Sequence, residues 1–325
     1  MNNIEFSIIV PVYNIQVYIE ECLMSIRNQD IKDIEIICVN DCSTDNSLNI
    51  LNKIIKIDDR IKIINHERNK GLSAARNTGI REAKGKYILF IDGDDILVEN
   101  SLKRIYLQIK NKDLDILRCN FIYFYNNRNI YTENKRYDID KRNIINGEEL
   151  FVSLYKSKEY KPMAWMNIYR REFLLKNNLF FCDGILHEDV EFTPRAFARA
   201  KNTDIANINL IIYRIRDNSI TSTFNPKKNR DLLYIIILLK EMIENEVSSK
   251  ETKRYMYELI SSNLITVINN INENEKNYYF KIIKDNKLIE TLLLSRNWKN
   301  IIRYLIMKIF SVKNYIKLSK LMISK

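Results

Sequence analysis

The chain has 325 residues and a formal net charge of +11, with 46% hydrophobic and 29% charged residues. These values are typical of globular domains and exclude an intrinsically disordered chain. The length allows one large domain or two modest ones. The longest apolar runs, such as residues 232–239, are too short to span a bilayer as a helix.

The cysteines and the first residues of the sequence predict where the protein is found. The five cysteines are odd in number and lack the paired spacing of a metal site. The amino-terminal residues show no basic segment followed by an apolar stretch, so no signal peptide is expected. We therefore expect a reduced, cytoplasmic protein, either free or peripheral on the inner face of the cell membrane.

Short apolar segments alternate with amphipathic segments along most of the chain. Strands are expected at residues 6–14, 35–41, 60–66, 87–91, 115–121 and 207–216, with edge strands within residues 123–142. Helices are expected at residues 18–28, 48–55, 71–83, 101–110, 147–155, 170–177 and 188–200. Such alternation predicts an α/β fold with a mostly parallel sheet flanked by helices. From Pro226 onward the pattern is helical.

The segment 87–91 ends abruptly in Asp92-Gly93-Asp94-Asp95. A buried strand would deliver these carboxylates to its carboxyl end, the edge at which open α/β sheets bind ligands. Carboxylate oxygens in a tight turn suit Mg²⁺ or Mn²⁺ carrying a diphosphate. The alternative is structural, because Asp95 before Ile96 can serve as a helix N-cap.

Two common nucleotide-binding signatures are missing from the sequence. No G-x-G-x-x-G follows the first expected strand, and no G-x-x-x-x-G-K-[ST] occurs anywhere. Dinucleotide-binding and P-loop proteins are therefore disfavoured.

Several segments together resemble the family 2 glycosyltransferases, enzymes of the GT-A fold that use nucleotide-sugar donors. The matching segments, in order, are residues 7–14 (SIIVPVYN), 40–45 (NDCSTD), 69–79 (NKGLSAARNTG), 92–95 (DGDD) and 188–189 (ED). The resemblance covers about residues 4–225, and five ordered motifs are more specific than any one of them.

The resemblance implies a nucleotide-sugar site at the carboxyl ends of the early strands. Asp94 would coordinate Mn²⁺ or Mg²⁺ on the donor diphosphate, with Asp92 on the ribose or on a metal-bound water. Asp41 would contact the base. The expected nucleotide-sugar-binding residues are Pro11, Tyr13, Asn14, Asp41, Arg76, Asp92 and Gly93.

Two of these residues have structural alternatives. Tyr13 offers an aromatic face for the base, or it covers the edge of the core. Arg76 can pair with phosphate, or it can form a salt bridge within the protein.

The His187-Glu188-Asp189 segment is the second expected chemical centre. The resemblance implies that Asp189 is the general base that deprotonates an acceptor hydroxyl, with Glu188 as its orienting partner. The alternative is structural, since acidic residues favour helix N-termini.

The sequence departs from the family pattern at two places. Asn167 stands where lysine is usual, which puts a phosphate or acceptor contact from that position in doubt. Some GT-A enzymes bind the metal with a histidine from the later part of the chain. Here the histidines are His66 and His187, so no histidine after residue 187 can do so. Metal binding would then rest on Asp94, diphosphate oxygens and water. Trp165 is a candidate wall for the acceptor sugar, with core packing as the alternative.

The expected organisation is a GT-A catalytic domain at residues 1–225, followed by a helical region at residues 226–325. The nucleotide-sugar half would span about residues 1–97 and the acceptor half about residues 98–225. Residues 216–221 resemble a loop that closes over the donor in relatives. Residues 296–325 are basic and amphipathic, which predicts either contact with an anionic membrane surface or docking onto the catalytic domain.

The function expected from these features is metal-dependent, inverting transfer of a sugar, with UDP as the expected carrier. The acceptor would be a hydroxyl of a growing surface glycan or lipid-linked glycan. A nucleotidyltransferase would need a glycine-rich triphosphate loop near the amino end, which is missing. A nucleic-acid-binding protein using the basic tail is the alternative from another class, and carboxylates at strand ends argue against it, so no nucleic-acid partner is expected.

Overall fold

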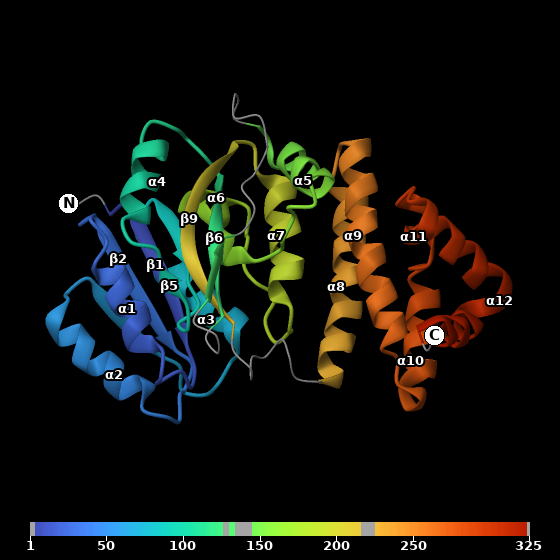
Figure 1. Ribbon diagram of the computed structural model, residues 1–325, viewed down its shortest axis with the longest axis horizontal. Helices are drawn as coiled ribbons and strands as arrows, with labels where there is room; N and C mark the ends of the chain where they lie inside the picture. The colour runs from blue at the N-terminus through green and yellow to red at the C-terminus, as the bar shows by residue number, and fades with distance from the viewer. Residues whose placement is uncertain (1–3, 126–129, 134–144, 216–224, 324–325) are drawn as a thin grey trace. The chain divides into compact units, whose positions relative to one another are not determined.

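The computed structural model describes residues 4–125, 130–133, 145–215 and 225–323 (Figure 1). Contacts divide the chain into two compact units, one of Met1–Gly184 with Arg199–Thr223 and one of Ile185–Ala198 with Phe224–Lys325. The helical region thus takes in a segment from the middle of the chain. The expected domain boundary at residue 225 stays a prediction, and the suggested donor-covering loop at residues 216–221 lies outside the described residues.

The first part of unit 1 is a parallel α/β layer. Its strands, in spatial order, are β3 (Ile61–Asn65), β2 (Ile34–Asn40), β1 (Phe6–Val12) and β4 (Tyr87–Phe90). All neighbouring strands in this group are parallel. The connecting helices are α1 (Ile19–Arg27), α2 (Ser47–Ile54) and α3 (Leu72–Glu82). Every residue of β1 and β4 is buried, as expected for strands covered on both faces.

The rest of the sheet is mixed. Beyond β4 come β8 (Asn167–Arg170), β6 (Ile116–Tyr125), β9 (Thr203–Ile215) and β5 (Ile96–Leu97), and β7 (Ile130–Glu133) pairs with β6. The sheet is flanked by α4 (Ser101–Ile109), α5 (Gly147–Lys156) and α6 (Arg171–Lys176). The α/β class is confirmed. The antiparallel strand β8 was not predicted, because four residues are too few to show a period.

The order of the strands brings the candidate site together. The chain reverses its direction across the sheet at β1, since β2 lies on one side of it and β4 on the other. Such a switch point opens a crevice at the carboxyl ends of the strands. The segments that follow β1, β2 and β4 start at residues 13, 41 and 91. All three therefore begin at one edge of the sheet.

Unit 2 consists of helices, coloured orange to red in Figure 1 apart from α7 (Glu188–Arg199). The others are α8 (Pro226–Asn245), α9 (Lys250–Asn269), α10 (Lys276–Asp285), α11 (Glu290–Leu294) and α12 (Trp298–Ile323). Polar side chains begin the two longest regular helices: Asn225 accepts from the amide of Lys227, and Ser249 accepts from the amide of Thr252.

Helix α12 is interrupted at Ser311, whose φ of 73° is not helical. Within the described residues, no helix combines the length and the apolar composition needed to cross a membrane.

We expect Gly85→Ala to destabilise unit 1. A Cβ atom at Gly85 would lie 2.6 Å from the Ser7 amide nitrogen and 2.8 Å from the Phe6 carbonyl carbon. Backbone atoms of a central strand cannot move aside, so the free energy of unfolding should fall by about 1–3 kcal/mol. Urea denaturation measures the change. The exposed neighbour offers the control Lys84→Ala, and equal stability of the two variants would contradict the close approach.

Candidate active site

The acidic turn, residues 92–95, follows β4. The amide of Asp95 donates to the carbonyl of Asp92 at 2.9 Å, which closes the turn. The side chains of Asp92 and Asp94 are half-exposed, whereas Asp95 is buried. The turn therefore presents two carboxylates to solvent and keeps the third inside. The N-cap alternative for Asp95 does not apply, because a short strand (β5) follows it.

Negative charge is concentrated at this turn. Burial, followed by the charges of Asp94 and Asp92, raises the pKa of the Asp95 carboxyl well above its usual value. Burial and the same three aspartates raise the pKa of Tyr213 to about 12. A bound cation would offset the negative charge of these carboxylates, so the charge of the turn is suited to a divalent ion.

The ligand set fits an ion that the substrate helps to hold. Among the described side chains, no group of three or more His, Cys, Asp or Glu residues is arranged to bind a metal. Mg²⁺ and similar ions often use one or two carboxylates and take their other ligands from phosphates and water. Asp92 and Asp94 can supply those carboxylates.

Arg214 on β9 holds the acidic turn in place. Its Nε donates to the Asp94 carbonyl and its amide donates to Asp95 Oδ1, both at 2.9 Å. Its guanidinium also pairs with Glu21 on α1 at 2.6 Å and lies over the rings of Tyr18 and Phe124. The side chain is buried, so the turn is tied to two distant elements through one cation.

Sequence reasoning missed Arg214. The signal was an arginine within the apolar segment 208–215, INLIIYRI. A charged residue that ends up buried in a strand needs specific partners, and here they are the acidic turn and Glu21.

Arg76 on α3 contacts the acidic turn from within the core. Its side chain is 1% exposed, and it donates to Asp92 Oδ1 at 2.8 Å. The guanidinium also lies 5.1 Å from the centroid of the Phe181 ring. This geometry makes Arg76 a residue that positions Asp92. Its contact with phosphate stays a prediction.

Asp41 follows β2 and organises the loop that begins α3. Its carboxylate accepts from His66 Nδ1 at 2.6 Å and from the amides of Lys70 and Gly71 at 2.8 and 2.7 Å. Gly71 has a φ of 89°, which favours glycine at this sharp turn. A carboxylate accepts about four hydrogen bonds, so these donors leave capacity for one more. The contact of Asp41 with a base stays a prediction.

The segment after β1 carries two expected binding residues. The Tyr13 ring is 47% exposed, so it can receive a base. Asn14 Oδ1 instead accepts from the amides of Thr44 and Asp45, at 2.8 and 3.3 Å. Asn14 therefore joins the loops that follow β1 and β2, and a direct ligand contact from either residue stays a prediction.

Gly93, within the acidic turn, lies close to Pro11. Pro11 is a buried residue of β1. A Cβ atom at Gly93 would lie 2.3 Å from Ile15 Cδ1 and 3.1 Å from the Pro11 carbonyl oxygen. A larger residue here would have to displace the Ile15 side chain and would press on the β1 backbone, so the site favours glycine. Ligand contacts from these two residues stay predictions.

Trp165 is packed inside unit 1. It is 3% exposed, stacks on Tyr213 with ring centroids 5.3 Å apart, and meets Phe121 edge-on. This is the core-packing alternative, and the half-exposed Tyr213 is the ring that feels the charges of the acidic turn. An acceptor contact from Trp165 stays a prediction.

Asn167 lies beside a cation from another strand. Arg118 on β6 is fully buried, and its Nη1 donates to Asn167 Oδ1 at 3.2 Å. Asn167 in turn donates to the hydroxyl of Tyr169 at 2.9 Å. Where lysine is usual in the family, this chain therefore has an amide whose oxygen accepts a hydrogen bond from a buried arginine.

Glu188 and Asp189 begin α7 in unit 2. Glu188 is buried and Asp189 half-exposed. The preceding segment is anchored within the same unit, because the Leu186 amide donates to Asp231 Oδ2 on α8 at 2.8 Å. Burial, followed by the charge of Lys228, lowers the pKa of His187, which favours the neutral imidazole. The roles of Glu188 and Asp189 in catalysis stay predictions.

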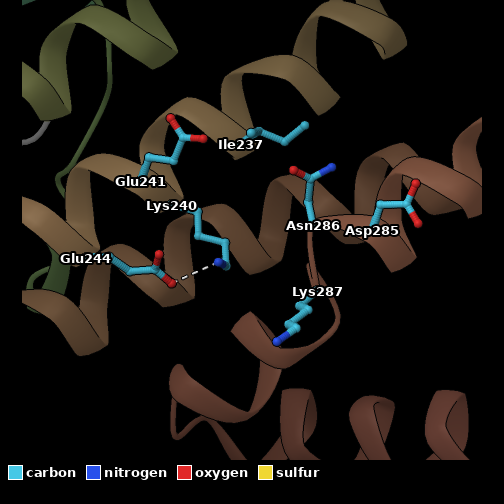
Figure 2. Close-up of a pocket in the computed structure, with 7 residues that line it drawn as sticks. All are labelled: Ile237, Lys240, Glu241, Glu244, Asp285, Asn286 and Lys287. Carbon is cyan, nitrogen blue, oxygen red and sulfur yellow. Dashed lines mark ion pairs between the residues drawn. The ribbon is translucent and has the colours of Figure 1, made fainter.

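A surface cavity of about 230 Å³ lies on unit 2, and its lining carries charges of both signs, unlike the acidic turn (Figure 2). Figure 2 shows Lys240 paired with Glu244 on α8, at 2.8 Å, facing the end of α10. The lining residues are Ile237, Lys240, Glu241, Glu244, Asp285, Asn286 and Lys287. The lining mixes charges of both signs, and among the described residues its carboxylates form no metal-binding group of three or more, so no chemistry is assigned to this cavity.

Comparison with known proteins identifies the family. The profile of Glycosyl transferase family 2 matches residues 7–177, which include the loops after β1, β2 and β4. The chain belongs to glycosyl transferase family 2. The family resemblance noted in the sequence is confirmed.

Individual relatives agree with this family assignment. The uncharacterized glycosyltransferase EpsJ of Bacillus subtilis is 38% identical over 66% of this chain and 62% of its own length. Glycosyltransferase GlyA of Streptococcus pneumoniae is 33% identical over 69% of this chain and 32% of its own length. The match thus spans less than two thirds of either relative.

Solved structures share the fold. The crystal structure of S. aureus TarS 1-349 superposes with a TM-score of 0.77 at 21% identity, covering 97% of this chain and 90% of TarS 1-349. The GT-A fold expected from the sequence is therefore confirmed.

We expect Arg214→Gln to lower the free energy of unfolding by about 2–3 kcal/mol, because glutamine leaves the Asp94 carbonyl and Glu21 without their charged donor. Urea denaturation measures the loss. Arg104→Gln removes an exposed arginine of α4 and serves as the control. If the two variants were equally stable, Arg214 would not hold the turn.

Proposed function

We propose that the protein transfers a sugar, with inversion, from a UDP-sugar to a hydroxyl of a growing surface glycan, with a divalent metal ion bound at the acidic turn. The observation that carries this proposal is the pair of half-exposed carboxylates, Asp92 and Asp94, where negative charge is concentrated at the carboxyl end of β4.

The names of similar proteins support this choice of donor and metal. TarS has been crystallised in complex with UDP and with UDP-GlcNAc. The mannosyltransferase PcManGT of Pyrobaculum calidifontis, which superposes with a TM-score of 0.55, was solved with GDP-Man and Mn²⁺. UDP is therefore the first donor nucleotide to test, and GDP is the comparison.

On the donor side, the residues of unit 1 bind and orient. Asp94 and Asp92 would hold the ion, which supplies positive charge that stabilises the diphosphate as it leaves. Arg76 keeps Asp92 in position through its buried ion pair. The exposed ring of Tyr13 would receive the base, and Asp41 would accept a hydrogen bond from it.

On the acceptor side, we assign the general base to Asp189. The acceptor oxygen attacks the anomeric carbon, the bond from that carbon to the diphosphate oxygen breaks, and the hydroxyl proton passes to the Asp189 carboxylate. Attack opposite the leaving group inverts the anomeric configuration. Glu188 would orient Asp189 from the same first turn of α7.

The names of two further relatives support a glycan or lipid-linked acceptor. One is a poly(ribitol-phosphate) beta-glucosyltransferase of Bacillus spizizenii, 33% identical over 216 residues. The other is a cholesterol galactosyltransferase of Borreliella burgdorferi, 29% identical over 275 residues. We accordingly propose that the protein works on the inner face of the cell membrane, where a lipid-linked acceptor would be within reach.

We expect Asp94→Asn to weaken the binding of UDP in the presence of Mn²⁺ by about tenfold or more, because an amide is a poorer ligand for a hard cation. Isothermal titration calorimetry with UDP, in Mn²⁺ and in EDTA, measures the effect. In EDTA the variant should match the wild type. Asp59→Asn, at an exposed carboxylate, is the control. Unchanged metal-dependent binding in Asp94→Asn would rule out the metal site.

We expect Asp189→Asn to bind UDP with unchanged affinity and to transfer sugar about 10²–10⁴-fold more slowly, since only proton removal is lost. Radiolabelled UDP-sugars, offered with a panel of glycan and lipid-linked acceptors, measure transfer. Asp59→Asn again serves as the control. If Asp189→Asn transferred sugar at the wild-type rate, Asp189 would not be the general base.

A further inference from the structure

Helix α12 exposes large apolar side chains on one face. Trp298 is 66% exposed, Ile302 45%, Leu305 49% and Ile309 70%. At about 100° per residue, these four positions fall within about 60° of one another around the helix axis. They precede the interruption at Ser311, so they belong to one regular helical segment. We call these four residues the α12 stripe.

The opposite face of α12 packs against the other helices of unit 2. Met307 and Asn300 are buried and lie on the other side of the helix from the α12 stripe. Asn300 donates to Ser295 Oγ at 3.2 Å, and α12 contacts α9 and α11. Docking of the helix therefore explains its buried face and leaves the α12 stripe unexplained. A row of large exposed apolar residues marks an interaction surface.

Charge identifies what can cover the α12 stripe. Lys299 and Lys308 lie on its two flanks, and the Lys299 Nζ is 5.7 Å from the centroid of the Trp298 ring. No acidic residue follows Glu290 in the sequence, whereas eight lysines and arginines do. An apolar stripe with Trp between basic flanks is the pattern of a helix that lies in the surface of an anionic membrane.

A second copy of the chain fits this surface less well. In a symmetric dimer the same face meets itself, so the basic flanks of one copy would approach those of the other. Such like-charge contacts oppose association. Anionic lipid headgroups, by contrast, pair with both flanks while the acyl region receives the four apolar side chains.

We propose that the α12 stripe and its flanking lysines bind the protein to an anionic lipid surface. This inference deepens the proposed function, because it names the surface that would bring the enzyme to a lipid-linked acceptor. The binding itself requires no donor, metal or acceptor.

The test is cosedimentation of the full chain with vesicles of phosphatidylcholine alone and of phosphatidylcholine mixed with phosphatidylglycerol in equal amounts. We expect binding to the mixed vesicles, weaker binding at higher salt, and little binding to phosphatidylcholine alone. Ile302→Ser with Ile309→Ser should weaken binding about tenfold or more. Lys299→Gln with Lys308→Gln should weaken it to a similar degree, about fivefold for each lysine.

Matched controls come from unit 1. Ile57→Ser with Leu107→Ser removes equally exposed apolar residues, and Lys53→Gln with Lys56→Gln removes exposed lysines from α2 and the turn after it. These variants should bind vesicles like the wild type. Circular dichroism shows whether each variant keeps its helices, and a wild type that binds vesicles but not UDP would overturn only the proposed donor.

Two results would overturn the lipid assignment. One is binding to mixed vesicles that the stripe variants weaken no more than the controls do. The other is no binding of the folded wild type to mixed vesicles, and a dimer, detected by light scattering, that Ile302→Ser with Ile309→Ser dissociates would then assign the stripe to a second copy.

Discussion

The charge of the acidic turn is the constraint on which the arrangement of unit 1 depends. Three carboxylates within residues 92–95 repel one another, and one of them is buried. Two buried arginines hold the turn, because Arg76 pairs with Asp92 and Arg214 donates to the Asp94 carbonyl. Each arginine is itself a buried charge, and removing the acceptors of a buried charge is costly, so the two arginines and the turn depend on one another. The two half-exposed carboxylates keep the negative potential that would attract the proposed metal ion.

The same edge of the sheet is held together by polar side chains that join its loops. Asn14 connects the segment after β1 to the segment after β2, and Asp41 connects the end of β2 to the start of α3. These contacts give the candidate binding loops fixed relative positions before any ligand arrives. A site built in this way loses little entropy on binding.

Unit 2 shows a different use of apolar residues. Helices α8 and α9 bury theirs against each other, whereas α12 buries one face and leaves large residues on the other. An exposed Trp and three exposed aliphatic residues cost free energy in water unless something covers them. The basic flanks favour an anionic surface for that purpose, which links the helical unit to the place where a lipid-linked acceptor would be found.

The sequence by itself determined the α/β class, the parallel core strands and the positions of the motifs. Strands such as 87–91 are continuous apolar runs, and runs of this kind can be recognised in the sequence without knowing which strands lie beside them. Tertiary structure alone decided what the polar residues touch. Asp92 pairs with Arg76, Asn167 accepts from Arg118, Trp165 packs under Tyr213, and Arg214 reaches the acidic turn from a strand more than a hundred residues later. It also decided which face of α12 is exposed. Partners distant in sequence leave no periodic signal, because hydrogen bonds and burial depend on where the fold brings each side chain.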